Sequence, residues 1–148
     1  MQKRERRVSS EIFAVIDTNV LVSAMLKWNS VPGHIIELVF DGLIVPVFSR
    51  EIIEEYKEVL SRSKFHLSND IVEDIIGSLT DSGIFVDGET QNMEFIDEKD
   101  RMFFEVVMEE RKEEDAYLVT GNIRHFPVEP FIVTPRQMLD IIVKSIDE

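Results

Sequence analysis

The stretch IFAVIDTN at residues 12–19 decides the fold of this chain. Its first five residues are apolar and rich in β-branched side chains, which is typical of a strand buried on both faces in a parallel sheet. The apolar run stops at Asp17, and Thr18 can then cap a helix over about residues 19–28. A buried strand that leads directly into a helix is the first half of a βαβ unit.

The rest of the chain repeats this alternation of short apolar runs with amphipathic stretches, without an internal repeat. Further strands are expected at residues 43–48, 84–86, 116–120 and 131–133. Helices are expected from Pro32 to about Gly42, after Ser49, from Ser68 to Gly83, around residues 102–107 and after Thr134. With right-handed crossovers, this order predicts a doubly wound three-layer α/β/α sandwich.

The composition is that of a globular protein with one domain. Of 148 residues, 44% are hydrophobic and 30% charged, so we expect a single domain over residues 11–148. Residues 1–10, which contain four basic side chains, are expected to form a flexible segment. No apolar run approaches the roughly 20 residues that span a bilayer, and residues 1–13 lack the apolar core of a secretory signal. We therefore expect a cytoplasmic protein without a membrane segment. The absence of cysteine excludes disulfides, thiolate metal sites and cysteine nucleophiles.

The net charge restricts the kind of partner. Lys and Arg total 16 and Asp and Glu 29, a formal charge of −13; residues 1–7 contribute +3, which leaves −16 for the remainder. Such a field repels a nucleic acid at long range. A nucleic-acid substrate would therefore need divalent cations or local basic groups in order to approach the protein.

The ends of two expected strands carry short oxygen-bearing side chains. Asp17 and Asn19 follow the first strand, and Thr120 and Asn122 follow the fourth. In open parallel sheets, ligands bind beyond the carboxyl ends of the strands, where the strand order reverses. Asp17 is the strongest candidate, because a carboxylate at such a place is costly unless a cation meets it. An Asx turn or a helix cap explains Asp17 equally well when the residue is taken alone.

Two more carboxylates are candidates for the same edge of the sheet. Glu55 lies on the helix after the second strand, and Asp100 begins the helix before the fourth. Each has a simpler explanation, since Glu55 belongs to a solvated acidic face and Asp100, like Asp97, can favour a helix N-terminus. Carboxylates brought together raise one another's pKa unless a divalent ion neutralises them, and all-oxygen ligands suit Mg²⁺ or Mn²⁺.

Four stretches of the sequence resemble PIN-domain proteins, in the branch of the VapC-like toxins of toxin–antitoxin pairs. They are FAVIDTNVLVSAML at 13–26, SREIIEEYKEVLSR at 49–62, DEKDRMFFEVV at 97–107 and AYLVTGNIRHFP at 116–127. They follow the family's order and spacing and cover most of the chain. The resemblance implies a five-stranded parallel sheet and a metal-dependent endoribonuclease that hydrolyses phosphodiester bonds of single-stranded RNA. It also implies a homodimer and an antitoxin that covers the site.

The resemblance assigns roles to particular residues. Catalytic acids are implied at Asp17, Glu55 and Asp100, which would hold one or two Mg²⁺ or Mn²⁺ ions directly or through water. Supporting polar groups are implied at Asn19 and Thr120. These groups would orient water, the ligand carboxylates or a phosphate oxygen.

At one position the chain departs from the family pattern. Many members carry an Asp after the Thr-Gly of the fourth strand, whereas this chain has Asn122, which keeps an oxygen ligand in the catalytic set but loses the charge. A second metal should therefore bind more weakly, unless Asp97 compensates. Three basic residues flank the expected ligands and either bind the phosphate backbone of the substrate or are ordinary surface charges: Lys99, Arg101 and Arg124.

Other classes of protein remain as alternatives or are excluded. A haloacid-dehalogenase-type phosphatase needs a second Asp two residues after the first, where this chain has Asn19. Neither a Gly-rich nucleotide-binding motif nor a GxSxG elbow is present. The main alternative is a PIN-fold binding or protein-interaction module with weak or no catalysis, which Asn122 and the strong acidity support. If the cleft binds RNA, His125 or Phe126 is a candidate to stack on an unpaired base.

Overall fold

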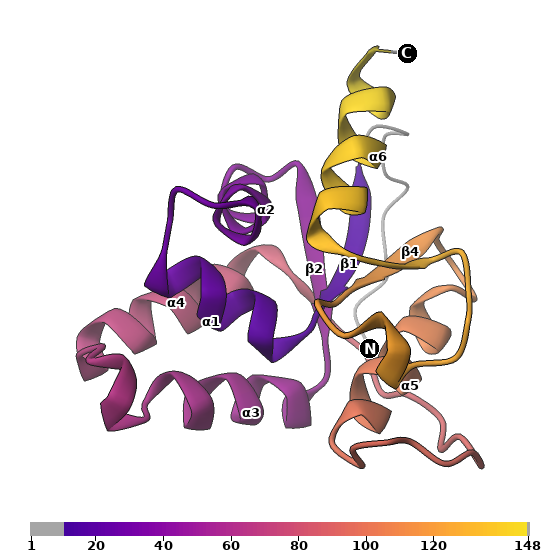
Figure 1. Cartoon of the computed structure of the whole chain (residues 1–148), viewed down its shortest axis with the longest axis horizontal. Helices are drawn as coiled ribbons and strands as arrows, with labels where there is room; N and C mark the ends of the chain where they lie inside the picture. The colour runs from indigo at the N-terminus through magenta and orange to yellow at the C-terminus, as the bar shows by residue number, and fades with distance from the viewer. Residues whose placement is uncertain (1–10, 148) are drawn as a thin grey trace.

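A computed structural model describes residues 11–147, so the basic segment expected over residues 1–10 lies outside the described residues. At its centre is a parallel sheet of five strands in the order β3-β2-β1-β4-β5 (Figure 1). The strands are β1 (Ile12–Ile16), β2 (Ile44–Phe48), β3 (Ile84–Phe85), β4 (Ala116–Val119) and β5 (Ile132–Val133). This sheet confirms the one expected from the sequence.

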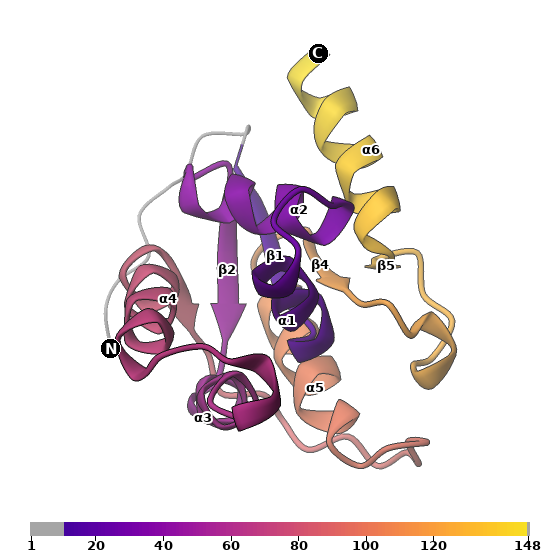
Figure 2. The ribbon, with the colours of Figure 1, turned by 60° about the vertical axis from the view of Figure 1, so that its left-hand side comes forward.

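Helices cover both faces of the sheet. They are α1 (Thr18–Leu26), α2 (Val31–Phe40), α3 (Arg50–Leu60), α4 (Asn69–Ser82), α5 (Asp100–Glu110) and α6 (Pro135–Asp147), with 3-10 turns η1 (Ser63–Phe65) and η2 (Ile123–His125). On one face α2 packs against α1, α4 and α6, whereas α5 packs against β1, β2 and β4 on the other. Figure 2 shows α1 and α2 in front of the sheet and α3 below the end of β2. The architecture is the three-layer α/β/α sandwich predicted from the sequence.

The strand order reverses between β1 and β4. From β1 the chain builds outward through β2 to β3, and α5 then leads back across the sheet to β4 and β5 on the other side of β1. The register pairs Ile16 with Val119, and the backbone N–H of Asp17 donates to the Val119 carbonyl at 2.9 Å. Asp17 and Thr120, the next residue of each strand, therefore leave the sheet side by side at its carboxyl edge.

Local hydrogen bonds explain where the helices begin. Ser30, Ser49 and Ser68 each accept a hydrogen bond from the backbone N–H three residues later, at 3.1–3.2 Å. The first helix differs from the prediction, because its cap is Asp17 and not Thr18. The Asp17 carboxylate accepts a hydrogen bond of 3.3 Å from the backbone N–H of Asn19. A short carboxylate side chain at the end of a strand can thus begin a helix and face a site at the same time.

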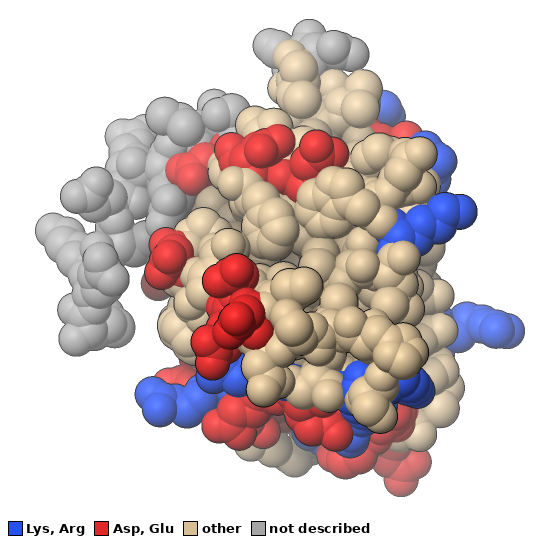
Figure 3. Space-filling model, turned by 90° about the vertical axis from the view of Figure 1, so that its left-hand side faces the viewer, with Lys and Arg blue, Asp and Glu red and all other residues tan. Residues whose placement is uncertain are grey.

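The interior and the surface differ sharply in polarity. β2 is buried along its whole length, as is β1 from Phe13 onward. The face shown in Figure 3 carries separate acidic clusters around an area without charged residues, with Lys and Arg near its edges. Among the described residues, this face has no continuous basic track for a nucleic-acid backbone.

Within residues 11–147, none of the helices has the length and apolar character needed to span a bilayer.

Candidate active site

Two buried polar side chains, Asp17 and Thr120, form the floor of the candidate site at the point where the strand order reverses. They are 5% and 0% exposed. The Thr120 hydroxyl donates a hydrogen bond of 2.7 Å to Oδ2 of Asp17, while Oδ1 accepts from the backbone N–H of Asn19. Oγ1 of Thr120 in turn accepts from the backbone N–H of Asn122 at 3.0 Å. Neighbouring strands therefore hold the Asp17 carboxylate in one orientation.

The charge of Asp17 is poorly compensated within the protein. Burial raises the pKa of Asp17 above its ordinary value, and the hydrogen bonds from Thr120 and Asn19 offset only part of that effect. Among the described residues, no Lys or Arg forms an ion pair with Asp17. The negative charge of Asp97 raises the pKa further, whereas His125 lowers it. Ionised Asp17 is thus costly in the protein alone and would be favoured by a bound cation.

A second carboxylate reaches the site from the N-terminus of α5. Oδ2 of Asp100 lies 3.0 Å from Nδ1 of His125 in η2, the turn that follows β4. Burial raises the pKa of Asp100, and the negative charges of Asp17 and Asp97 raise it further, while the hydrogen bond from His125 lowers it. Because these carboxylates influence one another's ionisation, Asp17, Asp97 and Asp100 belong to one electrostatic site.

The third expected acid, Glu55, is connected to the site through its neighbour Tyr56. The Tyr56 hydroxyl donates a hydrogen bond of 2.5 Å to the carbonyl of Ile16, the residue before Asp17. Burial raises the pKa of Tyr56, and the negative charges of Asp17 and Glu55 raise it further. Oε1 of Glu55 lies 3.9 Å from Nζ of Lys99. α3 is therefore fixed to the end of β1, with Glu55 and Asp17 both close enough to Tyr56 to act on its ionisation.

Three other expected site residues lie at the surface around these acids. Asn19 is exposed on the first turn of α1, and Asn122 is exposed after β4. Asp97 is exposed in the loop before α5, where its Oδ1 accepts a hydrogen bond of 3.0 Å from the backbone N–H of Lys99. The catalytic role of Asn122 and the supporting roles of Asn19 and Asp97 stay predictions.

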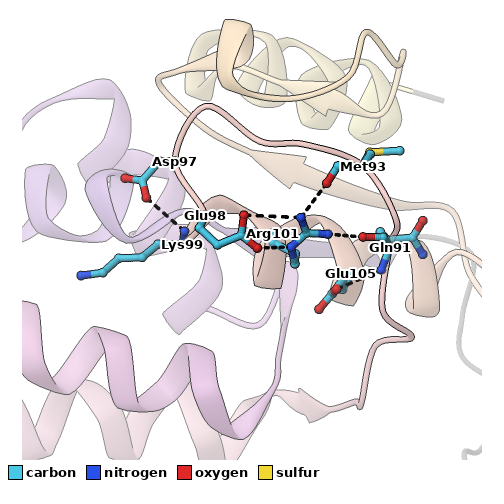
Figure 4. A network of polar contacts seen from close by, with 7 residues as sticks. All are labelled: Gln91, Met93, Asp97, Glu98, Lys99, Arg101 and Glu105. Carbon is cyan, nitrogen blue, oxygen red and sulfur yellow. Dashed lines mark hydrogen bonds and ion pairs between the residues drawn. The ribbon is translucent and has the colours of Figure 1, made fainter.

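The basic residues expected to bind substrate differ in their partners. Lys99 and Arg124 are exposed, so their charges are accessible to a phosphate backbone. Arg101 instead directs its guanidinium to the loop of residues 86–99, here called the rim loop, and to the carboxylate of Glu98 (Figure 4). Because its donors are engaged within the protein, Arg101 does not fit the expected contact with substrate. Lys99 and Arg124 remain candidates for that contact.

The donor set suits a hydrated divalent ion. Within residues 11–147, no three His, Cys, Asp or Glu side chains form a ready-made metal-binding group. The donors on the site floor and at Asp100 are carboxylate and hydroxyl oxygens, which favour Mg²⁺ or Mn²⁺ over softer metals. Mg²⁺ usually keeps several waters and is held by one or two carboxylates. Asp17 and Asp100 are two carboxylates of this kind, and burial raises the pKa of each.

Sequence reasoning missed two contacts that shape the site. His125 holds Asp100, 25 residues away, and Tyr56 reaches the end of β1 across 40 residues. No local pattern could reveal partners at such separations. The expectation that Phe126 could stack on a base is wrong, because its side chain is 6% exposed and its ring lies 6.4 Å from that of Phe95 in the interior.

Fold and site together define a class of protein, a doubly wound α/β domain with acids from separate elements at the carboxyl edge of its sheet. The family model of the PIN domain matches residues 14–124. The uncharacterized protein MJ1680 of Methanocaldococcus jannaschii is 30% identical over 125 residues, which cover 82% of this chain and 76% of that protein. No solved structure gives a significant match. The chain belongs to the PIN-domain family.

Family membership gives the general chemistry of the fold. PIN domains are generally nucleases, hydrolases of phosphodiester bonds in nucleic acids, and they typically use divalent metal ions. Asp17 follows β1 at the carboxyl edge of the sheet, the edge at which ligands of open parallel sheets bind. The roles that the resemblance implies for individual residues are proposed below.

Proposed function

We propose that this protein is a Mg²⁺- or Mn²⁺-dependent endoribonuclease that cleaves single-stranded RNA in the cytoplasm. The observation that carries the proposal is the buried carboxylate of Asp17, held by Thr120 where the strand order reverses, with the negative charge of Asp17 acting on Asp100 of α5. The resemblance to VapC-like proteins supports a toxin of a toxin–antitoxin pair, with an antitoxin over the site and a homodimeric state. The net charge of −13 supports a need for cations in nucleic-acid binding.

Asp17, Glu55 and Asp100 would hold the cation, directly or through water. A bound Mg²⁺ or Mn²⁺ supplies Lewis-acid chemistry, activating water and offsetting charge on the scissile phosphodiester. Thr120 keeps the Asp17 carboxylate in one orientation, and His125 does the same for Asp100. Such outer contacts matter because a carboxylate free to rotate binds a cation less well.

The groups at the surface of the site would act on the substrate. Lys99 and Arg124, both exposed, would attract the phosphate backbone despite the overall negative charge. Asn19 and Asn122 would orient water or a phosphate oxygen, and Asp97 would add negative charge that favours the cation.

A second candidate function is a PIN-fold binding or protein-interaction module with weak or no catalysis. Asn122 favours it, since this residue supplies no charge where many family members have an acid. The engagement of Asp100 by His125 favours it as well, because a cation would share that oxygen with the imidazole. The two candidates differ in whether RNA is cleaved or only bound.

Cleavage of an unstructured RNA separates the candidates. The wild type, Asp17→Asn and Asp100→Asn are each incubated with the RNA in Mg²⁺, in Mn²⁺ and in EDTA. Asp81→Asn is the matched control, because Asp81 is exposed near the end of α4, just before β3 begins and hence at the opposite edge of the sheet. The wild type and the control should cleave only with metal, and the two site variants should lose about a hundredfold or more in rate.

Two results would overturn the nuclease proposal. A wild type that binds the RNA without cleaving it in either metal identifies the binding module. Cleavage that survives both Asp17→Asn and Asp100→Asn comes from another nuclease or another site, and the assignment of the acids then fails.

A further inference from the structure

The rim loop reaches α5 from the edge strand β3 and carries Asp97 and Lys99. It has no strand or helix of its own over most of its length, so its shape depends on contacts with its surroundings. Asp97 acts electrostatically on both Asp17 and Asp100, and Lys99 lies beside Glu55. The position of this loop therefore determines where the charges of Asp97 and Lys99 lie relative to the acids of the site.

Arg101, in the first turn of α5, is the centre of the contacts that hold the rim loop. Its guanidinium donates to the backbone carbonyls of Gln91 and Met93, the latter at 2.6 Å, and to the carboxylate of Glu98 (Figure 4). It also lies over the ring of Phe95, with Cζ 4.9 Å from the centroid. One side chain thus contacts four residues of the loop.

Other contacts seal the same loop against α5. Oε2 of Glu105 accepts a hydrogen bond of 3.1 Å from the backbone N–H of Gln91. A Cβ added to Gly88 would lie 2.6 Å from the backbone of Glu105, so at this point the two backbones touch directly. The ring of Phe95 packs between those of Phe104 and Phe126, at 5.7 and 6.4 Å. These contacts hold the rim loop against α5 at Gly88, Gln91 and Phe95. Arg101 connects this part of the loop with Glu98 near its end.

We propose that Arg101 is a positioning residue that clamps the rim loop onto α5 and thereby places Asp97 and Lys99 beside the acids of the site. Figure 4 shows Asp97 and Lys99 on one side of Glu98 and the contacts of Arg101 with Gln91 and Met93 on the other. Arg101 has no contact with substrate in this role. The catalytic consequence rests on the proposed function, whereas the clamp itself is measured without cleavage.

Lysine is the informative substitution because it keeps the charge but loses the geometry. A guanidinium donates in several directions from one plane, whereas an ammonium is a point charge on a flexible chain and cannot bridge two carbonyls and a carboxylate in the same way. If Arg101 bound phosphates, Arg101→Lys would keep most of the function and only Arg101→Gln would weaken RNA binding. A clamp predicts that both variants fail alike.

Hydrogen–deuterium exchange reads the clamp directly. In Arg101→Lys and Arg101→Gln, the amide of Gln91, which donates to Glu105, should exchange about tenfold faster or more, while the amides of β1 and β4 stay protected. Arg62→Lys is the matched control, since exposed Arg62 pairs with Glu58 one turn earlier on α3. Glu98→Gln removes the charge of one partner of Arg101 but keeps an acceptor oxygen, so it should loosen the loop in the same direction by a smaller factor.

Activity supplies the second readout. Both Arg101 variants should raise the Mn²⁺ concentration for half-maximal cleavage by about tenfold, the usual size for residues that orient a metal site, with KM for RNA changed less than about twofold. Unchanged exchange in Arg101→Lys and Glu98→Gln overturns the clamp, as does a raised KM in Arg101→Gln alone. A wild type that cleaves nothing defeats the proposed function, and the exchange data then still decide the clamp.

Discussion

The floor and the rim loop of the candidate site are built in different ways. Asp17 and Thr120 follow two paired strands, and the register of β1 and β4 brings them together. The rim loop has no such register, and a side chain outside it, Arg101, holds its backbone carbonyls. Substitutions on the floor should therefore change cation binding without changing the conformation of the site. Substitutions around the rim loop should change the conformation of that loop.

The largest expected effect lies at the floor and concerns the bound cation. Mn²⁺ at about 100 times its Kd should raise the free energy of unfolding of the wild type by about 2.7 kcal/mol, as for any ligand that binds only the folded state. Asp17→Asn should lose most of this stabilisation, because it removes a buried charge from the cation. Thermal unfolding in Mn²⁺ and in EDTA measures the difference. Equal stabilisation of the variant would place the ion elsewhere.

The next effect tests how α3 is fixed to the floor. Tyr56→Phe leaves the carbonyl of Ile16 buried without its 2.5 Å hydrogen bond, and it should lower the free energy of unfolding by about 2 kcal/mol. Urea unfolding measures the loss. Tyr117→Phe makes the same change at a half-buried position in β4 and should change stability by less than about 0.5 kcal/mol. Similar losses in both variants would remove the special role of Tyr56.

A smaller effect concerns the orientation of Asp100. His125→Ala should weaken Mn²⁺ binding by about tenfold, because Asp100 loses the group that orients its carboxylate. His125→Asn should restore most of the affinity, since its amide nitrogen can stand where Nδ1 does. Titration followed by electron paramagnetic resonance gives both constants. Tighter binding in His125→Ala would show that the imidazole competes with the ion.

Restoring an acid after β4 should have a modest effect in the opposite direction. Asn122→Asp adds one negative charge at the edge of the site and should tighten Mn²⁺ binding about fivefold, the size of the Coulomb interaction between a unit charge and a divalent ion about 9 Å apart in water. The Mn²⁺ concentration for half-maximal RNA cleavage should fall by a similar factor. If neither quantity changes, Asn122 is not part of the metal site.

The smallest effect is on stability without metal. The pKa of Asp17 is raised in the folded protein by burial, so the folded state binds the proton more readily than the unfolded chain and ionised Asp17 costs stability above that raised pKa. The cost disappears as the pH falls toward the ordinary value of 3.8. In EDTA, Asp17→Asn should therefore be more stable than the wild type at neutral pH, with a difference that shrinks on acidification. A constant difference would contradict the raised pKa.

The sequence predicts the fold well because its signals are local. Buried runs such as residues 12–16, and the capping residues Ser49 and Ser68, indicate strands and helix starts within a few residues of where they occur. The cap of the first helix is Asp17 and not Thr18, so the helix-cap interpretation of Asp17 is correct and the same residue also belongs to the floor of the site. The two outer strands are also shorter than expected, because β3 and β5 have two residues each where the sequence predicts three.

The site was predictable only where the topology brings strand ends together. Asp17 and Thr120 follow from the strand order, but the contact of His125 with Asp100 depends on the turn of η2, which no periodicity reveals. For Arg101, charge and proximity to Asp100 suggested a substrate contact. The fold of the rim loop instead brings backbone carbonyls to its guanidinium.

A crystal soaked in Mn²⁺ tests the central claim most directly, because manganese scatters anomalously and marks its own position. The account predicts an anomalous peak within coordinating distance of the carboxylates of Asp17 and Asp100, and its absence in a crystal of Asp17→Asn. A peak bound only to other surface acids, or a peak unchanged by that substitution, would contradict it.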